Sequence, residues 1–199
     1  MMRCVLFLLM FPIAFVNPGL STEPHPKALP NAHAPGDFDI AENVAFIVAD
    51  PSKLPGIVLD ETDAVLRGSW QYSTHTPPYV GIGYLHDQKS GKGEKSVTWT
   101  PKIPKAGKYE VRLSHCYNVK RSTNTPVAIC HALGDTTVRI NQQEIPQHGR
   151  LFRTLGVFQF EAGHLGSVTV SNDDTGDKYV IADAVQFLPV LAEEKPTRL

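Results

Sequence analysis

The chain has few cysteines, three among 199 residues, and they do not follow a metal-binding pattern. No C-x-x-C pair is present, and no grouping of cysteine with histidine has the spacing of a zinc site. Charge of either sign is not in excess, since 19 Lys and Arg face 20 Asp and Glu. A near-neutral surface gives no reason to expect nucleic acid as a partner, and no basic helix indicates a membrane surface.

The common catalytic signatures are missing as well. The sequence contains no G-x-S-x-G elbow, no H-E-x-x-H motif or EF-hand loop, and no dinucleotide fingerprint within a βαβ unit. Its carboxylates are scattered, and none pairs with another in an apolar setting as a glycosidase requires. We therefore predict a protein that is not an enzyme and that needs no cofactor or metal. The acidic run from Asn172 to Asp177 could hold calcium, but such a run is more typical of a hairpin turn.

No apolar run is long enough to cross a bilayer. The uncharged stretch from Cys4 to Val16 falls short of the roughly 20 residues that a membrane-spanning helix needs. Arg3 precedes this stretch and small residues follow it, which is the layout of a secretory signal. We predict a signal peptide at 1–21, a Pro-rich linker at 22–43, one domain at 44–189 and a polar tail at 190–199. The protein is then secreted or periplasmic, with no membrane span after signal cleavage.

Residues 44–189 show no sustained helical period and instead resemble a series of short strands. The segments are rich in Val, Ile, Tyr, Phe and Trp, and Gly, Pro or Asn-Asp turns separate them. The predicted strands are 44–49, 57–59, 64–67, 70–73, 84–86, 96–100, 108–116, 126–132, 136–141, 152–160, 167–171 and 179–188. This pattern predicts an all-β fold, a single antiparallel β-sandwich or jelly roll.

The segment 108–116 alternates between apolar and polar residues, which predicts one buried face and one wetter face. Cys116 and Cys130 are the two cysteines left after signal cleavage. In an exported protein such a pair suggests a disulfide, although two free thiols remain the alternative. The bridge requires the strands 108–116 and 126–132 to be neighbours.

Asp183 is a carboxylate inside the otherwise apolar segment VIADAVQF. A buried carboxylate needs hydrogen-bond donors or a proton, so we predict a structural anchor at this position rather than a catalytic group. Arg121, His131 or backbone amides could supply the donors. For Arg121 we expect an ion pair with Asp183 or Asp87, with a bound saccharide as the competing partner.

The stretch GSWQYSTHTPPYVGIGYLHD, residues 68–87, gathers aromatic and polar side chains in one place. Sugar rings stack on Trp and Tyr, while His, Asp, Asn and Arg hold hydroxyl groups. The same aromatic residues could instead belong to the core, which is the more common outcome for Trp70 and Tyr84. The candidate ligand-binding residues are Trp70, His75, Tyr79, Tyr84, His86, Asp87, Arg121, Asn124 and His131.

Several blocks of this sequence resemble the golvesin / xanthan-lyase carbohydrate-binding-like domain family. The most distinctive are R-x-T-N-x-P from Arg121, the triplet NQQ from Asn141, and the closing ADAV from Ala182, and the match covers about residues 50–189. The resemblance implies a non-catalytic β-sandwich that binds polysaccharide or glycan. Such domains usually accompany a polysaccharide lyase or an FAD-dependent oxidoreductase. The alternative is a cell-envelope structural or protein-interaction domain, with an envelope protein as its partner.

Overall fold

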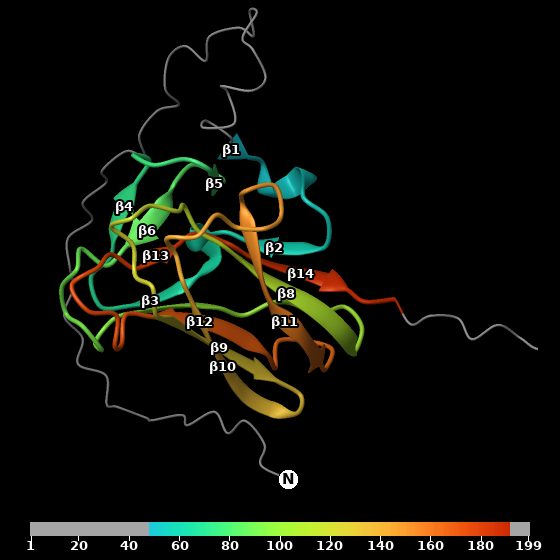
Figure 1. Ribbon diagram of the computed structural model, residues 1–199. Coiled ribbons are helices and arrows are strands. Elements are labelled where there is room, and N and C mark those ends of the chain that lie inside the picture. The colour runs from blue at the N-terminus through green and yellow to red at the C-terminus, as the bar shows by residue number, and fades with distance from the viewer. Residues whose placement is uncertain (1–47, 192–199) are drawn as a thin grey trace, which may run out of the picture.

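The computed structural model describes residues 48–191, which form strands, turns and two short 3-10 helices (Figure 1). The predicted signal peptide, the linker and most of the predicted strand 44–49 lie outside the described residues, and their boundaries stay predictions. The 3-10 helices are η2 (Pro51–Lys53) and η3 (Glu61–Asp63). Within this part of the chain, no helix has the length and apolar character needed to span a membrane.

Two antiparallel sheets form the body of the domain. One has the order β10-β9-β12-β7-β3, with strands at Gly134–Ile140, Thr125–His131, Ser167–Ser171, Ser96–Trp99 and Val65–Arg67. The other has the order β11-β8-β14-β2, with strands at Phe152–Phe160, Gly107–Ser114, Val185–Pro189 and Ile57–Leu59. These bounds agree closely with the strands predicted from the sequence.

Smaller strands gather at one end of the body (Figure 1). A three-stranded antiparallel sheet has the order β13-β6-β4, at Ile181–Ala182, Tyr84–His86 and Gln71–Ser73. A parallel pair joins β1 (Val48–Ala49) to β5 (Tyr79–Val80).

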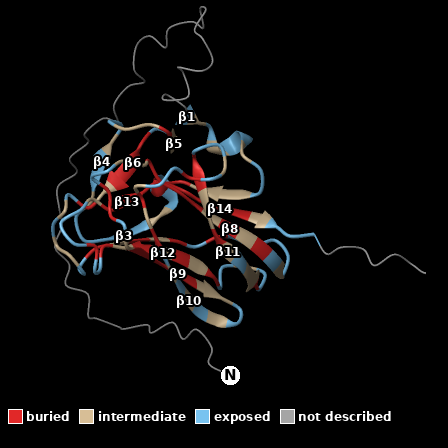
Figure 2. Cartoon of the chain, in the orientation of Figure 1, coloured by how far each residue is buried: buried red, intermediate tan, exposed pale blue. Residues whose placement is uncertain are grey.

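The two large sheets share one apolar core, so the predicted β-sandwich is confirmed. Trp99 of β7 and Ile129 of β9 lie in the same buried cluster as Leu113 of β8 and Phe187 of β14. Buried residues concentrate along β8, β9, β12 and β14 (Figure 2). The alternation predicted for β8 also holds at its centre, where Val111 is buried and its neighbours are only half buried.

The predicted strand 179–188 is broken into β13 and β14. β13 pairs with β6 of the small sheet, whereas β14 pairs with β8 and β2 of the large one. The break falls at Asp183, whose carboxylate accepts the Ser114 hydroxyl and the backbone N–H of Val80. The chain therefore changes sheets at the residue whose buried charge demands donors from other segments.

The predicted disulfide between Cys116 and Cys130 is wrong. The two cysteines are not joined: Cys116 follows β8 and Cys130 lies in β9, and these two strands belong to different sheets. β8 pairs with β11 and β14, while β9 pairs with β10 and β12. The segment between β8 and β9 crosses from one sheet to the other instead of forming a hairpin. β8 and β9 are therefore consecutive in the sequence but not neighbours in a sheet.

Candidate functional site

A pocket of about 220 Å³ lies beside the three-stranded sheet. Segments far apart in the sequence meet there: strands β4 and β6, the loop after β8, and the loop before β13. The pocket is lined by Ser73, His75, Thr76, Tyr84, His86, Asn118, Lys120, Arg121 and Tyr179. We call it the Arg121 pocket. Its lining contains two basic side chains and two histidines but no carboxylate.

Backbone hydrogen bonds hold the two loops of the Arg121 pocket side by side. The N–H of Ser122 donates to the carbonyl of Tyr179 over 2.8 Å, and the N–H of Tyr179 donates to the carbonyl of Lys120 over 3.1 Å. The Gln143 side-chain amide donates to the carbonyl of Arg121 over 2.8 Å. Gln143 belongs to the NQQ triplet, one of the blocks that resemble the golvesin family. This hydrogen bond gives the triplet a structural role.

The guanidinium of Arg121 is buried without a carboxylate partner. It lies 5.9 Å from the ring centre of Tyr84 and 5.7 Å from that of Tyr179, within reach of both aromatic faces. Its only hydrogen bonds in residues 48–191 are a long one of 3.5 Å to the Tyr84 hydroxyl and one of 3.4 Å to the Cys116 sulfur. Its Nε atom is buried and has no partner in that range.

The expected ion pair between Arg121 and Asp183 or Asp87 is therefore wrong. Asp183 takes its donors from Ser114 and Val80, and Asp87 pairs with Lys92 at 2.7 Å. Asp183 is hydrogen-bonded by neutral donors, and the ammonium of Lys92 is the ion-pair partner of Asp87. The charge of Arg121 is left facing the pocket.

His86 presents one ring nitrogen to a possible ligand. Its Nδ1 accepts the backbone N–H of Gln88 over 3.2 Å, so the neutral ring carries its proton on Nε2. The ring packs edge-on against Tyr179, with centroids 5.3 Å apart. Burial lowers the pKa of His86, and the nearby charge of Arg121 lowers it further. His86 therefore remains neutral at pH 7, with an N–H suited to a sugar hydroxyl.

Of the predicted ligand-binding residues, His75, Tyr84, His86 and Arg121 line the pocket. Tyr84 is nevertheless almost fully buried, with 2% of its surface exposed, so only its hydroxyl end is suited to a ligand. Tyr79 is half buried, and its ring centre lies 6.0 Å from that of Tyr84. It packs against the buried cluster that includes Tyr84 and is not part of the pocket lining.

The other predicted residues lie elsewhere. Trp70 packs against the core, and its indole N–H donates to the carbonyl of Arg67 over 3.1 Å. Asn124 donates to the carbonyl of Asp174 over 3.1 Å. His131 lines a separate pocket beside Phe158, with ring centres 5.1 Å apart.

Asp87 is fully buried in a hydrogen-bonded junction rather than in the Arg121 pocket. The Lys92 ammonium contacts the Asp87 carboxylate at 2.7 Å, the Thr175 hydroxyl at 3.0 Å and the Lys178 carbonyl at 2.6 Å. Two of these oxygens come from the segment 172–178. The Lys92 ammonium thus links Asp87 to the segment 172–178, which forms a turn after β12.

Five residues of the Arg121 pocket were not predicted from the sequence. Ser73 and Tyr179 had been assigned to strands, and the other three are polar residues of loops without a recognisable motif. They are Ser73, Thr76, Asn118, Lys120 and Tyr179. Only the convergence of four separate segments reveals them.

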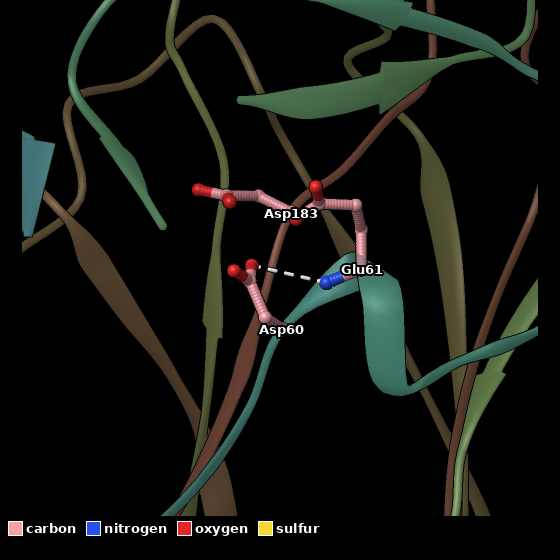
Figure 3. A group of neighbouring side chains, drawn as sticks. All are labelled: Asp60, Glu61 and Asp183. Carbon is pink, nitrogen blue, oxygen red and sulfur yellow. Dashed lines mark hydrogen bonds between the residues drawn. The ribbon is translucent and has the colours of Figure 1, made fainter. Parts of the chain in front are cut away.

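A second group of functional side chains is buried: Asp60, Glu61 and Asp183, here called the carboxylate cluster (Figure 3). Each offers an oxygen, and these oxygens lie within 4.8 Å of one another. Burial raises the pKa of Asp183 well above its usual value. Burial, together with the adjacent Asp60 carboxylate, raises the pKa of Glu61 to about 9. The sequence did not predict this cluster, because 121 residues lie between Glu61 and Asp183.

The strands, core and pocket together define a carbohydrate-binding-like β-sandwich module. The chain belongs to the Golvesin C-terminal domain family, whose model matches residues 57–189. The resemblance seen in the sequence is thereby confirmed.

Two relatives place the domain within larger proteins. A xanthan lyase of Bacillus sp. (strain GL1) is 41% identical over 160 residues, which cover 77% of this chain and 17% of that protein. The solved structure of a Paenibacillus xanthan lyase has 36% identity and a TM-score of 0.62, covering 67% of this chain and 13% of that chain. The chain therefore spans less than a fifth of either lyase.

A more distant structure shares only the fold. The GH26-CBM35 β-(1,4)-mannanase of Podospora anserina is 18% identical, with a TM-score of 0.52 over 70% of this chain and 28% of that one.

Proposed function

We propose that this chain is an exported, non-catalytic module that binds polysaccharide in the Arg121 pocket. The observation that carries the proposal is Arg121, which lines the pocket and whose buried guanidinium has no carboxylate partner in the described part of the chain. Arginine can donate several hydrogen bonds in a fixed plane. Vicinal hydroxyls or a carboxylate of a sugar suit that geometry.

The surrounding side chains support a sugar ligand. Tyr179 offers aromatic surface, Tyr84 offers its hydroxyl end, and His75, His86, Ser73 and Asn118 offer further hydrogen-bonding groups. Small-ligand sites combine apolar walls with a few well-placed polar groups in this way. The volume of about 220 Å³ suits one or two sugar units rather than a long groove.

The content of the pocket argues against glycoside hydrolysis. Hydrolysis of a glycosidic bond usually requires a pair of carboxylates flanking the bond that is cleaved, and no carboxylate lines this pocket. Membership of a family found within xanthan lyases makes a targeting role beside an enzyme a natural one.

Retention on immobilised polysaccharides, xanthan among them, tests the proposal. The full chain should be retained, and free oligosaccharide of the same polymer should release it. Lys120→Ala removes an exposed cation of the pocket and should weaken retention. Lys102→Ala, an exposed lysine outside the pocket, is the matched control. No release of reducing ends should accompany binding.

Absence of competable retention on every polysaccharide would refute sugar binding. Equal loss in both lysine variants would show that the attraction is general charge rather than the pocket.

A further inference from the structure

The carboxylate cluster concentrates negative charge where water cannot reach it. Asp60 precedes helix η3, Glu61 begins that helix, and Asp183 lies between β13 and β14. Their exposed fractions are 7%, 5% and 0%. An ionised carboxylate inside a protein requires hydrogen bonds and a counter-charge. Three at one place require either protons or a cation.

Protein groups supply only neutral donors to this cluster. Asp183 accepts the Ser114 hydroxyl and the Val80 N–H, and Asp60 accepts the Glu61 N–H over 3.0 Å. None of the ion pairs in residues 48–191 includes a member of the cluster. The negative charge is therefore not balanced by any lysine, arginine or histidine of this region.

Glu61 is the second and independent indication of a ligand. Both of its carboxylate oxygens are buried, and neither has a hydrogen-bond partner within residues 48–191. Its side chain extends toward that of Asp183 (Figure 3). Buried polar atoms are nearly always satisfied in folded proteins, so the two unpaired oxygens of Glu61 require either a proton, which the raised pKa of this carboxyl favours, or a bound cation.

We propose that Asp60, Glu61 and Asp183 form a buried calcium-binding site. Carboxylate oxygens are the ligands that hard cations prefer, and Ca²⁺ takes six to eight of them at roughly 2.3–2.6 Å. Oxygens on opposite sides of a calcium ion are then about 4.6–5.2 Å apart, which matches the spread of up to 4.8 Å in this cluster. Mg²⁺ binds at about 2.0–2.1 Å and demands a tighter octahedron. The ion would tie η3 to the junction of β13 and β14.

Two neighbouring residues fit this assignment. Gly81 lets the backbone approach the cluster, since a Cβ at this position would come within 1.8 Å of Asp60 Oδ2. The indole N–H of Trp99 donates to the carbonyl of Asp60 over 2.8 Å. An aromatic ring so close to the site can transfer excitation to a lanthanide bound in place of calcium, which provides a direct reporter.

Metal analysis of the full chain is the first test. After dialysis against about 1 mM CaCl₂, a concentration in the range of calcium-binding extracellular modules, and removal of free ions, one calcium per chain should remain. Chelation with EGTA should lower the melting temperature. CaCl₂ should restore it in a concentration-dependent way, whereas MgCl₂ and NaCl at equal ionic strength should not.

Terbium and matched variants locate the ion. Excitation of the wild-type chain at the tryptophan band should give terbium emission that calcium displaces, and Trp99→Phe should remove most of this emission. Glu61→Gln keeps the side-chain shape but removes a charge, and it should weaken calcium binding at least tenfold. Asp173→Asn, in the exposed acidic turn after β12, should leave the calcium response intact.

Three results would overturn the proposal: a melting temperature independent of calcium with no retained ion, equal restoration by magnesium, or loss of the response in Asp173→Asn but not in Glu61→Gln. The metal analysis uses the unmodified chain, so it decides the matter even where a variant fails to fold. Polysaccharide retention is measured separately, and neither result depends on the other.

Discussion

The side-chain amide of Gln142 completes both backbone hydrogen bonds of Ile181. Its Nε2 donates to the Ile181 carbonyl over 2.8 Å, and its Oε1 accepts the Ile181 N–H over 2.9 Å. Both residues are fully buried. A glutamine thus takes the place of a neighbouring strand for β13, beside the Arg121 pocket.

Gln142→Leu should therefore destabilise the protein by about 2–4 kcal/mol, because it leaves a buried N–H and a buried carbonyl without partners. Urea unfolding measures the change. Gln147→Leu alters an exposed glutamine and should stay within about 0.5 kcal/mol of the wild type. If both variants have the same stability, the Gln142 amide does not support β13.

Local sequence pattern was enough to predict the large sheets but not the junctions between them. Alternation in β8 and β12 and the apolar run of β9 follow from burial on one or both faces of a sandwich. The break at Asp183 could not be predicted, because its donors, Ser114 and Val80, lie in distant segments. The proposed cysteine bridge failed for a related reason, since order along the chain does not determine order in a sheet.

The pocket was partly visible in the sequence. His75, Tyr84 and His86 were predicted because they cluster in one aromatic stretch, and Arg121 because it belongs to a distinctive block. Tyr179 was missed because an aromatic residue before an apolar run is equally typical of a strand. Asp87 was assigned to the site because it ends that same aromatic stretch, and His131 because of its residue type. Their hydrogen bonds to Lys92 and Thr136 place them in other networks.

Arg121→Gln should reduce retention on xanthan at least tenfold while leaving the melting temperature unchanged or higher. The buried guanidinium has no carboxylate partner among the described residues, so its removal relieves desolvation without breaking an ion pair. A positive pocket should also prefer an anionic glycan. The wild type should therefore bind xanthan whose carboxyl groups have been reduced to alcohols more weakly than it binds native xanthan. Arg121→Gln should bind both forms of xanthan equally weakly.

Arg67→Gln, an exposed arginine of β3, is the control for general charge. A clear drop in the melting temperature of Arg121→Gln, with binding per folded molecule preserved, would assign Arg121 a structural role instead. Equal binding of native and carboxyl-reduced xanthan would contradict the anionic preference alone.

Lys92→Met should lower stability by about 3 kcal/mol, since it leaves the buried Asp87 carboxylate without its counter-charge. The Lys92 ammonium also contacts the Thr175 hydroxyl and the Lys178 carbonyl, so the segment 172–178 should loosen. Lys89→Met is the matched control, because the Lys89 ammonium lies 4.0 Å from an exposed Asp177 carboxylate and such pairs contribute little. Urea unfolding of both variants at pH 7 should separate them, and equal stabilities would show that Asp87 is neutralised in another way.

His115 should make the protein sensitive to mild acid. Its side chain is fully buried, and burial lowers its pKa to about 3, with the positive charge of Arg153 and then of Arg121 acting in the same direction. In the unfolded chain the pKa is about 6.5. Between these two values the unfolded state binds the extra proton, so the stability supplied by the neutral ring is complete above about pH 6.5 and is lost as the pH falls toward 3.

For this single group, the loss between neutral pH and pH 5 amounts to about 2 kcal/mol. Leucine is similar in volume and cannot bind a proton. Between pH 7 and pH 5, the free energy of unfolding of His115→Leu, measured in urea, should therefore fall by about 2 kcal/mol less than that of the wild type. His164→Leu, an exposed histidine in the turn before β12, should behave like the wild type. Because the other titrating groups are shared, they cancel in this comparison. If the stability of the wild type and that of His115→Leu change equally between pH 7 and pH 5, the folded protein binds a proton at His115 as readily as the unfolded chain does. That result would contradict the lowered pKa expected from burial and from the nearby charges of Arg153 and Arg121.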